Sequence, residues 1–298
     1  MSAQQSPPLD LDFIADTVRK QECILFLGAG VHSPPPGRAN DDHDCERYPR
    51  LGADLSRELA HLCGLSTRYP QEDPTNLARV ATFFENQFSR HRLVLEITRK
   101  IQEDRQISPM LRALVELPFP LIITTNQDTL LESALLAAGK QPRLSIYNPE
   151  SRTSDDPRNL AAESPIVYKL HGDITHPETV VVTEEDLLKF TMRMGENEQF
   201  NPAPSGLKYH LRRWTTLFVG YSLRDYNLRL LFTTLRWRID NANLPDMYSV
   251  DPHPDPLVLE VWENKNRYVK FLAEDVWTFV PELYQRVLQK DCRYRERA

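Results

Sequence analysis

The feature of this sequence that most constrains its fold is a set of four polar or glycine-rich segments, each preceded by a short apolar run. Such runs are typical of buried strands, and open α/β sheets bind ligands where the carboxyl ends of their strands meet. One such tip is weak evidence, whereas four in order predict the walls of a single nucleotide pocket. The segments are Gly28-Ala29-Gly30-Val31, Thr124-Thr125-Asn126-Gln127-Asp128, Lys169-Leu170-His171-Gly172-Asp173 and Gly220-Tyr221-Ser222-Leu223.

The apolar spacing between these segments predicts strands that alternate with helices. Short apolar runs bounded by turn residues indicate strands, and apolar residues three or four apart indicate helices. Alternation of this kind is typical of a parallel sheet with helices on both faces. We therefore predict an α/β fold, a Rossmann-like, doubly wound and mostly parallel sheet with a helical insert. The expected strands are 23–27, 121–123, 166–170, 180–182, 217–219 and 247–250, and the main expected helices are 11–19, 51–62, 130–138 and 226–239.

The length of 298 residues allows one large domain, and we expect a single domain over 1–298. Thr183 and Asp186 have capping-box spacing before a further helix. Prolines exclude regular structure in the stretch after the first glycine segment, so a loop over the strand ends is expected there. The insert is expected at about 31–118, the loop at 32–50, irregular structure at 141–163 and a C-terminal extension at about 240–298.

Composition favours a soluble cytoplasmic protein. The chain is 41% hydrophobic and 26% charged, with a net charge of −6. No apolar run approaches the roughly 20 residues of a membrane-spanning helix, and the polar first ten residues do not resemble a secretory signal. Four scattered cysteines form no disulfide framework in a chain of this length. The negative charge argues against a surface that coats nucleic acid.

The two glycine segments are suited to the phosphates of a nucleotide. The small residues Gly28, Ala29 and Gly30 let the backbone approach a phosphate, and a helix N-terminus nearby would supply N–H donors. The usual dinucleotide fingerprint is not completed after Gly30, so a tight turn is the alternative. Ser222 is available to a phosphate or a ribose. Tyr221 either stacks on a ring or only fills space.

The two polar segments carry the candidate catalytic groups. Asn126 offers a neutral amide that can hold a ribose hydroxyl or a water molecule. His171 ends a strand beside Gly172 and can exchange a proton near neutral pH, which suits a general base. Asp128 contacts the ribose or caps the following helix, and both readings stay open. The other seven histidines are expected on the surface.

In this order, the four segments resemble the sirtuin (SIR2-like) NAD-binding family. Gly28-Ala29-Gly30-Val31 is similar to its phosphate turn, and Thr125-Asn126-Gln127-Asp128 to its ribose motif. His171-Gly172 is similar to its catalytic histidine motif. Gly220-Tyr221-Ser222-Leu223 resembles the loop that contacts the adenosine ribose and phosphates. The resemblance spans about residues 20 to 230, and the motifs are specific only jointly.

The chain also departs from the sirtuin deacylases. It has no Cys-x-x-Cys pair, whereas those enzymes carry a zinc ribbon with two. The only conceivable substitutes are His43, Cys45, His61 and Cys63, and His61 and Cys63 face different ways on a helix. No metal is therefore expected. The absences, together with Gly-Tyr-Ser-Leu-Arg-Asp at 220–225, resemble the bacterial SIR2-like branch of antiphage defence.

That resemblance implies hydrolysis of NAD to nicotinamide and ADP-ribose, with Asn126 and His171 as the catalytic residues. It implies that Gly28, Ala29, Gly30 and Val31 help to bind NAD. It assigns the same role to Thr125, Asp128, Gly220, Tyr221 and Ser222. It also implies a homo-oligomer that acts with a sensor such as a HerA-type ATPase.

Three other functions stay open. An NAD-dependent protein deacylase would use the same pocket, and a non-catalytic sensor of NAD or ADP-ribose would bind without turnover. A nucleic-acid-binding module is suggested by arginines and tryptophans at 212–214 and 229–238. Those arginines fall among apolar residues at helical spacing, which favours helix surfaces over nucleic-acid contacts.

Overall fold

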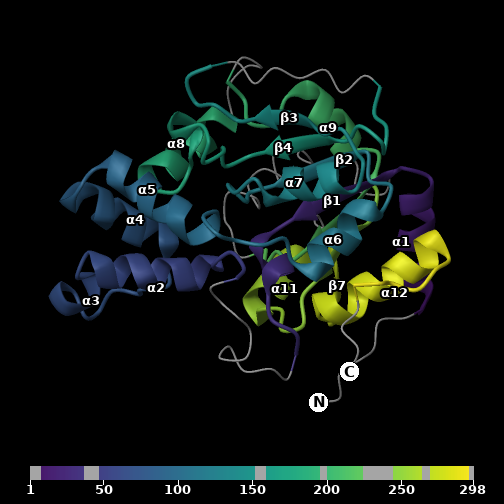
Figure 1. Cartoon of the computed structure of the whole chain (residues 1–298), viewed down its shortest axis with the longest axis horizontal. Coiled ribbons are helices and arrows are strands. Elements are labelled where there is room, and N and C mark those ends of the chain that lie inside the picture. Colours follow the sequence, from purple (N-terminus) through teal and green to yellow (C-terminus); the bar gives the residue numbers. More distant parts are fainter. Residues whose placement is uncertain are drawn as a thin grey trace.

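The computed structural model describes residues 8–36, 47–151, 159–194, 200–223, 244–263 and 269–294. Within these residues the core is a seven-stranded sheet of order β3-β4-β2-β1-β5-β6-β7 (Figure 1). Every pairing in it is parallel, which confirms the predicted Rossmann-like α/β fold. The strands are β1 (Cys23–Leu27), β2 (Leu121–Thr124), β3 (Arg143–Ile146), β4 (Ile166–Lys169), β5 (Thr215–Val219), β6 (Met247–Val250) and β7 (Val269–Leu272).

Helices cover both faces of the sheet (Figure 1). In β1, Leu25 and Leu27 point to one face and Ile24 and Phe26 to the other, because side chains alternate along a strand. The first face packs against α1, α6, α7 and α12, and the second against α8, α9 and α11. These helices are α1 (Pro8–Arg19), α6 (Pro109–Glu116), α7 (Leu130–Ala137), α8 (Glu184–Met194), α9 (Ser205–Leu211), α11 (Pro256–Glu263) and α12 (Val276–Leu288).

The helical segment between β1 and β2 makes a separate apolar cluster beside the sheet. Its helices α2–α5 form a group at one side of the sheet, and α4 contacts α8 (Figure 1). Their buried side chains pack with Ile174, Val180 and Val182, which follow β4 in the sequence. The segment therefore supports the chain that leaves β4. Its elements are the 3-10 turn η1 (Ala29–His32) and the helices α2 (Gly52–Leu62), α3 (Leu65–Arg68), α4 (Leu77–Gln87) and α5 (Arg90–Ile101), followed by α6.

The predicted elements match the structure where local patterns are strong. The strands predicted at 23–27 and 247–250 have the observed bounds. The capping box before α8 is confirmed, because Thr183 Oγ1 accepts from Asp186 N and Asp186 Oδ2 accepts from Thr183 N. The helix predicted at 226–239 and most of the loop predicted at 32–50 lie outside the described residues.

Two local predictions are wrong. Val180–Val182 forms no strand; its side chains are buried, but Val181 N donates to His171 O instead of to a sheet neighbour. Residues 143–146, predicted to be irregular, form the edge strand β3. A single pairing partner and exposed Arg143 and Leu144 explain why β3 lacks an apolar signature.

No helix in the part of the chain that the structure describes is long and apolar enough to cross a membrane.

Candidate functional site

Strand register brings the four predicted tips to one edge of the sheet. Leu27 pairs with Thr124 and with Val219, and Thr124 also pairs with Lys169. Each of these is the last residue of its strand, so the four tips leave β5, β1, β2 and β4 side by side. Strands lie about 4.8 Å apart, so the row spans roughly 14 Å. The row contains the switch point between β1 and β5, the place where open α/β sheets bind ligands.

The two glycine turns, 28–31 and 220–223, pack directly on each other. Gly30 N donates to Gly220 O over 2.9 Å. A Cβ on Gly28 would lie 2.3 Å from Gly220 O, and a Cβ on Gly220 would lie 2.3 Å from Val31 N. Gly220 also has a φ of +68°. Only glycine allows both this backbone conformation and this approach.

Several backbone N–H groups of the first glycine turn already donate hydrogen bonds within the protein. Gly28 N donates to Val219 O over 3.0 Å, and Val31 N donates to Gly28 O over 3.2 Å. Residues 29–32 form a single 3-10 turn, so the longer helix that would supply a strong dipole does not begin here. The contribution of Gly28 and Gly30 is therefore the close packing on Gly220 that their missing side chains allow.

The second glycine turn is anchored by aromatic side chains. The Tyr221 ring meets Phe26 edge-on at 5.5 Å between centroids, and Tyr221 Cδ2 lies 2.7 Å from where a Gly28 Cβ would be. These contacts favour the space-filling interpretation of Tyr221. Trp262 Nε1 donates to Leu223 O over 3.2 Å and ties the turn to α11. Ser222 is exposed.

The Asn126 turn (residues 125–129) is held through hydroxyl and carboxylate groups. Thr124 Oγ1 donates to Leu27 O over 2.9 Å and accepts from Asn126 N over 3.0 Å. Asp128 is buried, and its Oδ1 accepts from Leu130 N over 2.9 Å. The carboxylate thus bonds the first turn of α7, although the N-cap position itself is Thr129. This favours the capping interpretation of Asp128 over direct ribose contact.

The His171 segment (residues 170–182) places the predicted general base beside α8. The half-buried imidazole meets the Phe190 ring edge-on at 5.4 Å between centroids. Gly172 follows with a φ of +77°, and a Cβ on it would lie 2.0 Å from Thr179 O. The segment therefore folds back tightly on itself just after His171.

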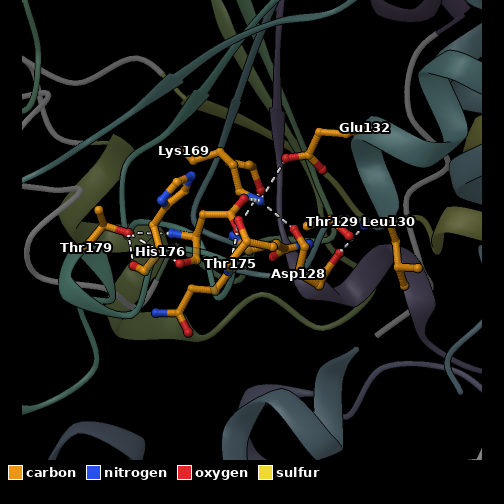
Figure 2. Close-up of polar contacts among 12 residues, drawn as sticks. Asp128, Thr129, Leu130, Glu132, Lys169, Thr175, His176 and Thr179 are labelled. Carbon is orange, nitrogen blue, oxygen red and sulfur yellow. Dashed lines mark hydrogen bonds and ion pairs between the residues drawn. The ribbon is translucent and has the colours of Figure 1, made fainter. Parts of the chain in front are cut away.

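A buried lysine joins the Asn126 turn to the His171 segment (Figure 2). Lys169 Nζ donates to Asp128 O over 2.5 Å, to Glu132 Oε1 over 2.8 Å and to Asp173 Oδ2 over 2.5 Å. The Lys169 side chain is 1% exposed. Asp173 Oδ1 accepts from Thr175 N and Oγ1, which fixes the turn beyond His171.

The protonation states follow from burial and charge. Burial raises the pKa of Asp128 and of Glu132. Burial alone would lower the pKa of Lys169, but the charges of Glu132 and Asp173 outweigh it and raise that pKa. Burial opposes ionisation of Asp173, and Lys169 nevertheless holds its pKa below the ordinary value. A charged Lys169–Asp173 pair is therefore the centre of the cluster.

Two features escaped the sequence analysis. Glu132 was assigned no role, although a lysine that ends a buried strand is a signal that an acidic partner lies nearby. His32 was expected on the surface, and that prediction is wrong. Its side chain lies in the 3-10 turn after Gly30 and is only 3% exposed.

A groove of about 730 Å³ lies at the opposite, amino-terminal edge of the sheet. Within it Arg213 stacks on Tyr209 at 4.4 Å, and His210 meets Trp214 at 4.3 Å. These packing contacts support the structural interpretation of residues 212–214 over nucleic-acid binding. The second set of arginines, at 229–238, is outside the described ranges. Among the described residues, no three His, Cys, Asp or Glu side chains gather as a metal site.

Comparison with known proteins identifies the family. A model of the SIR2-like domain matches residues 120–270, which include three of the four tips. The chain belongs to the SIR2-like family. The resemblance carried by the four segments is thereby confirmed.

Relatives of the chain include proteins named for NAD hydrolysis and for defence. A protein of Enterococcus faecium named NAD(+) hydrolase ThsA is 27% identical over 78% of this chain and 43% of its own length. A namesake from Cytobacillus dafuensis is 33% identical over 55% of this chain and 31% of its own. Defense-associated sirtuin 2 of Bacillus subtilis is 26% identical over 85% of this chain and 23% of its own length. The chain thus spans less than half the length of these relatives.

Proposed function

We propose that this SIR2-like chain hydrolyses NAD at the bond between nicotinamide and ribose, releasing nicotinamide and ADP-ribose. The observation that carries the proposal is the row of four tips at the carboxyl edge of the sheet, centred on the switch point between β1 and β5. Relatives named NAD(+) hydrolase support the reaction. The position of the row supports a dinucleotide as the ligand.

Binding is divided along this row. The pyrophosphate and adenosine ribose lie over the two glycine turns, next to Gly28-Ala29-Gly30-Val31 and Gly220-Tyr221-Ser222. Here the missing side chains let the two turns pack closely on each other, and exposed Ser222 offers a hydroxyl. The nicotinamide ribose lies over the Asn126 turn, with Thr125 at its entrance. Asp128 supports this turn from below through its bond to Leu130 N.

The chemistry needs little acid catalysis. Cleavage breaks the C1′–N bond through a transition state like an oxocarbenium ion, and nicotinamide leaves as a neutral molecule. Asn126 holds the ribose and the attacking water through its neutral amide. His171 accepts the proton of that water as the new C1′–O bond forms. Phe190, edge-on to the imidazole, limits the ring's rotation.

Incubation of the purified chain with NAD tests the proposal, with nicotinamide and ADP-ribose measured by chromatography. We expect His171→Ala and Asn126→Ala each to lower turnover by about 100-fold or more with the fold intact. His176→Ala is the matched control, because this imidazole lies in the same segment but its side chain is 55% exposed. Wild-type turnover in His171→Ala would refute the assignment.

The same assay separates the alternatives. Removal of the acyl group from an acylated peptide in the presence of NAD would favour a deacylase. Binding of NAD without turnover would favour a sensor, and salt-dependent binding to DNA would favour a nucleic-acid module.

We further propose that the chain acts in the cytoplasm as an effector of antiphage defence. In this role it depletes NAD as a homo-oligomer under a sensor such as a HerA-type ATPase. The family resemblance and the name of the Bacillus subtilis relative support this role. A purified chain that is monomeric and fully active alone would argue against oligomeric control.

A further inference from the structure

We propose that Gln127, the residue between Asn126 and Asp128, is a positioning residue that holds the His171 segment in register with the Asn126 turn. This inference rests on the proposed function for its catalytic consequence. Its geometric part stands on contacts that do not depend on the reaction.

Gln127 bonds the His171 segment at three points. Its side-chain Nε2 donates to Val181 O over 2.8 Å and to His171 O over 3.3 Å. Its backbone oxygen accepts from Ile174 N over 3.0 Å. The first and last of the bonded positions are ten residues apart in the sequence. Gln127 therefore bonds the beginning, the middle and the end of the segment that carries the predicted base.

The contact links the two candidate catalytic residues through one peptide bond, the Gln127 side chain and one hydrogen bond. Asn126 is the neighbour of Gln127 in the chain, and the bond to His171 is made at that residue's own carbonyl. A shift of the His171 backbone relative to Asn126 must stretch this bond. Gln127 thus restrains the backbone that carries His171 relative to the backbone that carries Asn126.

Lys169 supports the same pair of segments from the buried side. It donates to Asp128 O on the Asn126 turn and to Asp173 on the His171 segment. Gln127 is half-buried, whereas Lys169 lies beneath the surface. The two segments are therefore joined by the bonds of buried Lys169 and, nearer the surface, by the bonds of half-buried Gln127. Loss of the Gln127 side chain alone leaves the bonds of Lys169 to both segments intact.

The chemistry at this position requires a neutral double donor. Both acceptors of Nε2 are backbone carbonyls, so a carboxylate of the same length would repel them. A methionine has the same length and no donor. Asparagine is one methylene shorter than glutamine. These differences make the position testable by conservative substitution.

The experiment compares Gln127→Met and Gln127→Glu with wild type for kcat and KM on NAD. Gln102→Met is the matched control, because Gln102 Oε1 accepts from Thr129 N at the same turn but makes no bond to the His171 segment. We expect kcat to fall by about tenfold to 100-fold in Gln127→Met, and further in Gln127→Glu. We expect KM to stay within about threefold and Gln102→Met to keep its kcat. Equal kcat in Gln127→Met and wild type would overturn the inference.

Hydrogen–deuterium exchange of residues 170–182 gives a readout that needs no activity. The amides of this segment should exchange faster in Gln127→Met than in wild type or Gln102→Met. Unchanged exchange in Gln127→Met would overturn the positioning role. Failure of the wild-type chain to cleave NAD would refute the proposed function instead, and the exchange result would still decide what Gln127 holds.

Discussion

The two halves of the candidate site are built in different ways. Where β1 and β5 end, backbone lies against backbone, and Gly28, Gly30 and Gly220 make the contact. Where β2 and β4 end, side chains make the contact, through Lys169, Gln127 and their partners. The glycine half, formed by the two glycine turns, therefore tolerates no added side-chain atom. The polar half, formed by the Asn126 turn and the His171 segment, tolerates no lost charge or hydrogen-bond donor. Four predictions test this contrast, beginning with the largest expected effect.

Lys169→Met should be the most damaging change in the polar half. It leaves Glu132 and Asp173 buried without their cation, which costs about 3–5 kcal/mol of unfolding free energy. Chemical denaturation measures the loss. Lys189→Met is the control, because it removes an exposed pair with Glu150 and should change stability little. Equal losses in the two variants would show that the buried cluster is not special.

Gly220→Ala should be the most damaging single-atom change in the glycine half. The new Cβ would sit 2.3 Å from Val31 N at a φ of +68°, so strain and overpacking together cost about 3 kcal/mol. Gly139→Ala is the matched control. It has a φ of +81° but open space around the Cβ, and should cost only about 1–2 kcal/mol. If denaturation gives equal costs for both alanines, the close approach of the glycine turns is not required.

Asp186→Ala should loosen the far end of the His171 segment in a pH-dependent way. Asp186 Oδ2 accepts from Val182 N and Thr183 N and pairs with Arg90, so its loss costs about 2 kcal/mol at pH 7. Burial would raise the pKa of this carboxyl, but these bonds outweigh burial and hold it below the ordinary 3.8.

Because the folded-state pKa of Asp186 is depressed, its stabilisation is present above pH 3.8 and is lost as the pH falls through the lower folded value. Urea denaturation from pH 7 to pH 3 should therefore show wild type and Asp186→Ala converging at the acid end. A constant difference across this range would contradict the prediction. Asp54→Ala, which removes an exposed carboxylate bonded to Arg57, provides the baseline.

Trp277→Phe should have the smallest effect and tests whether a side chain matters for the first glycine turn. Trp277 Nε1 donates to Ser33 O over 2.9 Å, just after the 3-10 turn that follows Gly28. Loss of this one bond should cost about 1 kcal/mol and leave the affinity for ADP-ribose within about twofold. Thermal denaturation and calorimetric titration check both values. A larger loss of affinity would mean that the first glycine turn also depends on a side chain for its position.

The sequence predicted the sheet because its central strands are buried on both faces and read as continuous apolar runs, such as 23–27 and 121–123. The sequence-based prediction failed where the burial of side chains and the pairing of the backbone in the sheet do not coincide. β3 pairs with a neighbour while its side chains are largely exposed, and Val180–Val182 is buried without entering the sheet. Periodicity reports burial of side chains and does not report which backbone partner an amide finds.

For the candidate site, the sequence by itself determined which tips follow strands, and the residues of the four tips, in their order, indicated the SIR2-like family. That information is local, because an apolar run and the residue after it lie next to each other in the chain. The tertiary structure decided how the tips are held together. Gly28 meets Gly220, Lys169 meets Glu132, and Gln127 meets Val181 across separations of 37 to 192 residues. Such contacts arise only when parallel strands of defined order bring distant turns to one edge, and no local pattern encodes that order.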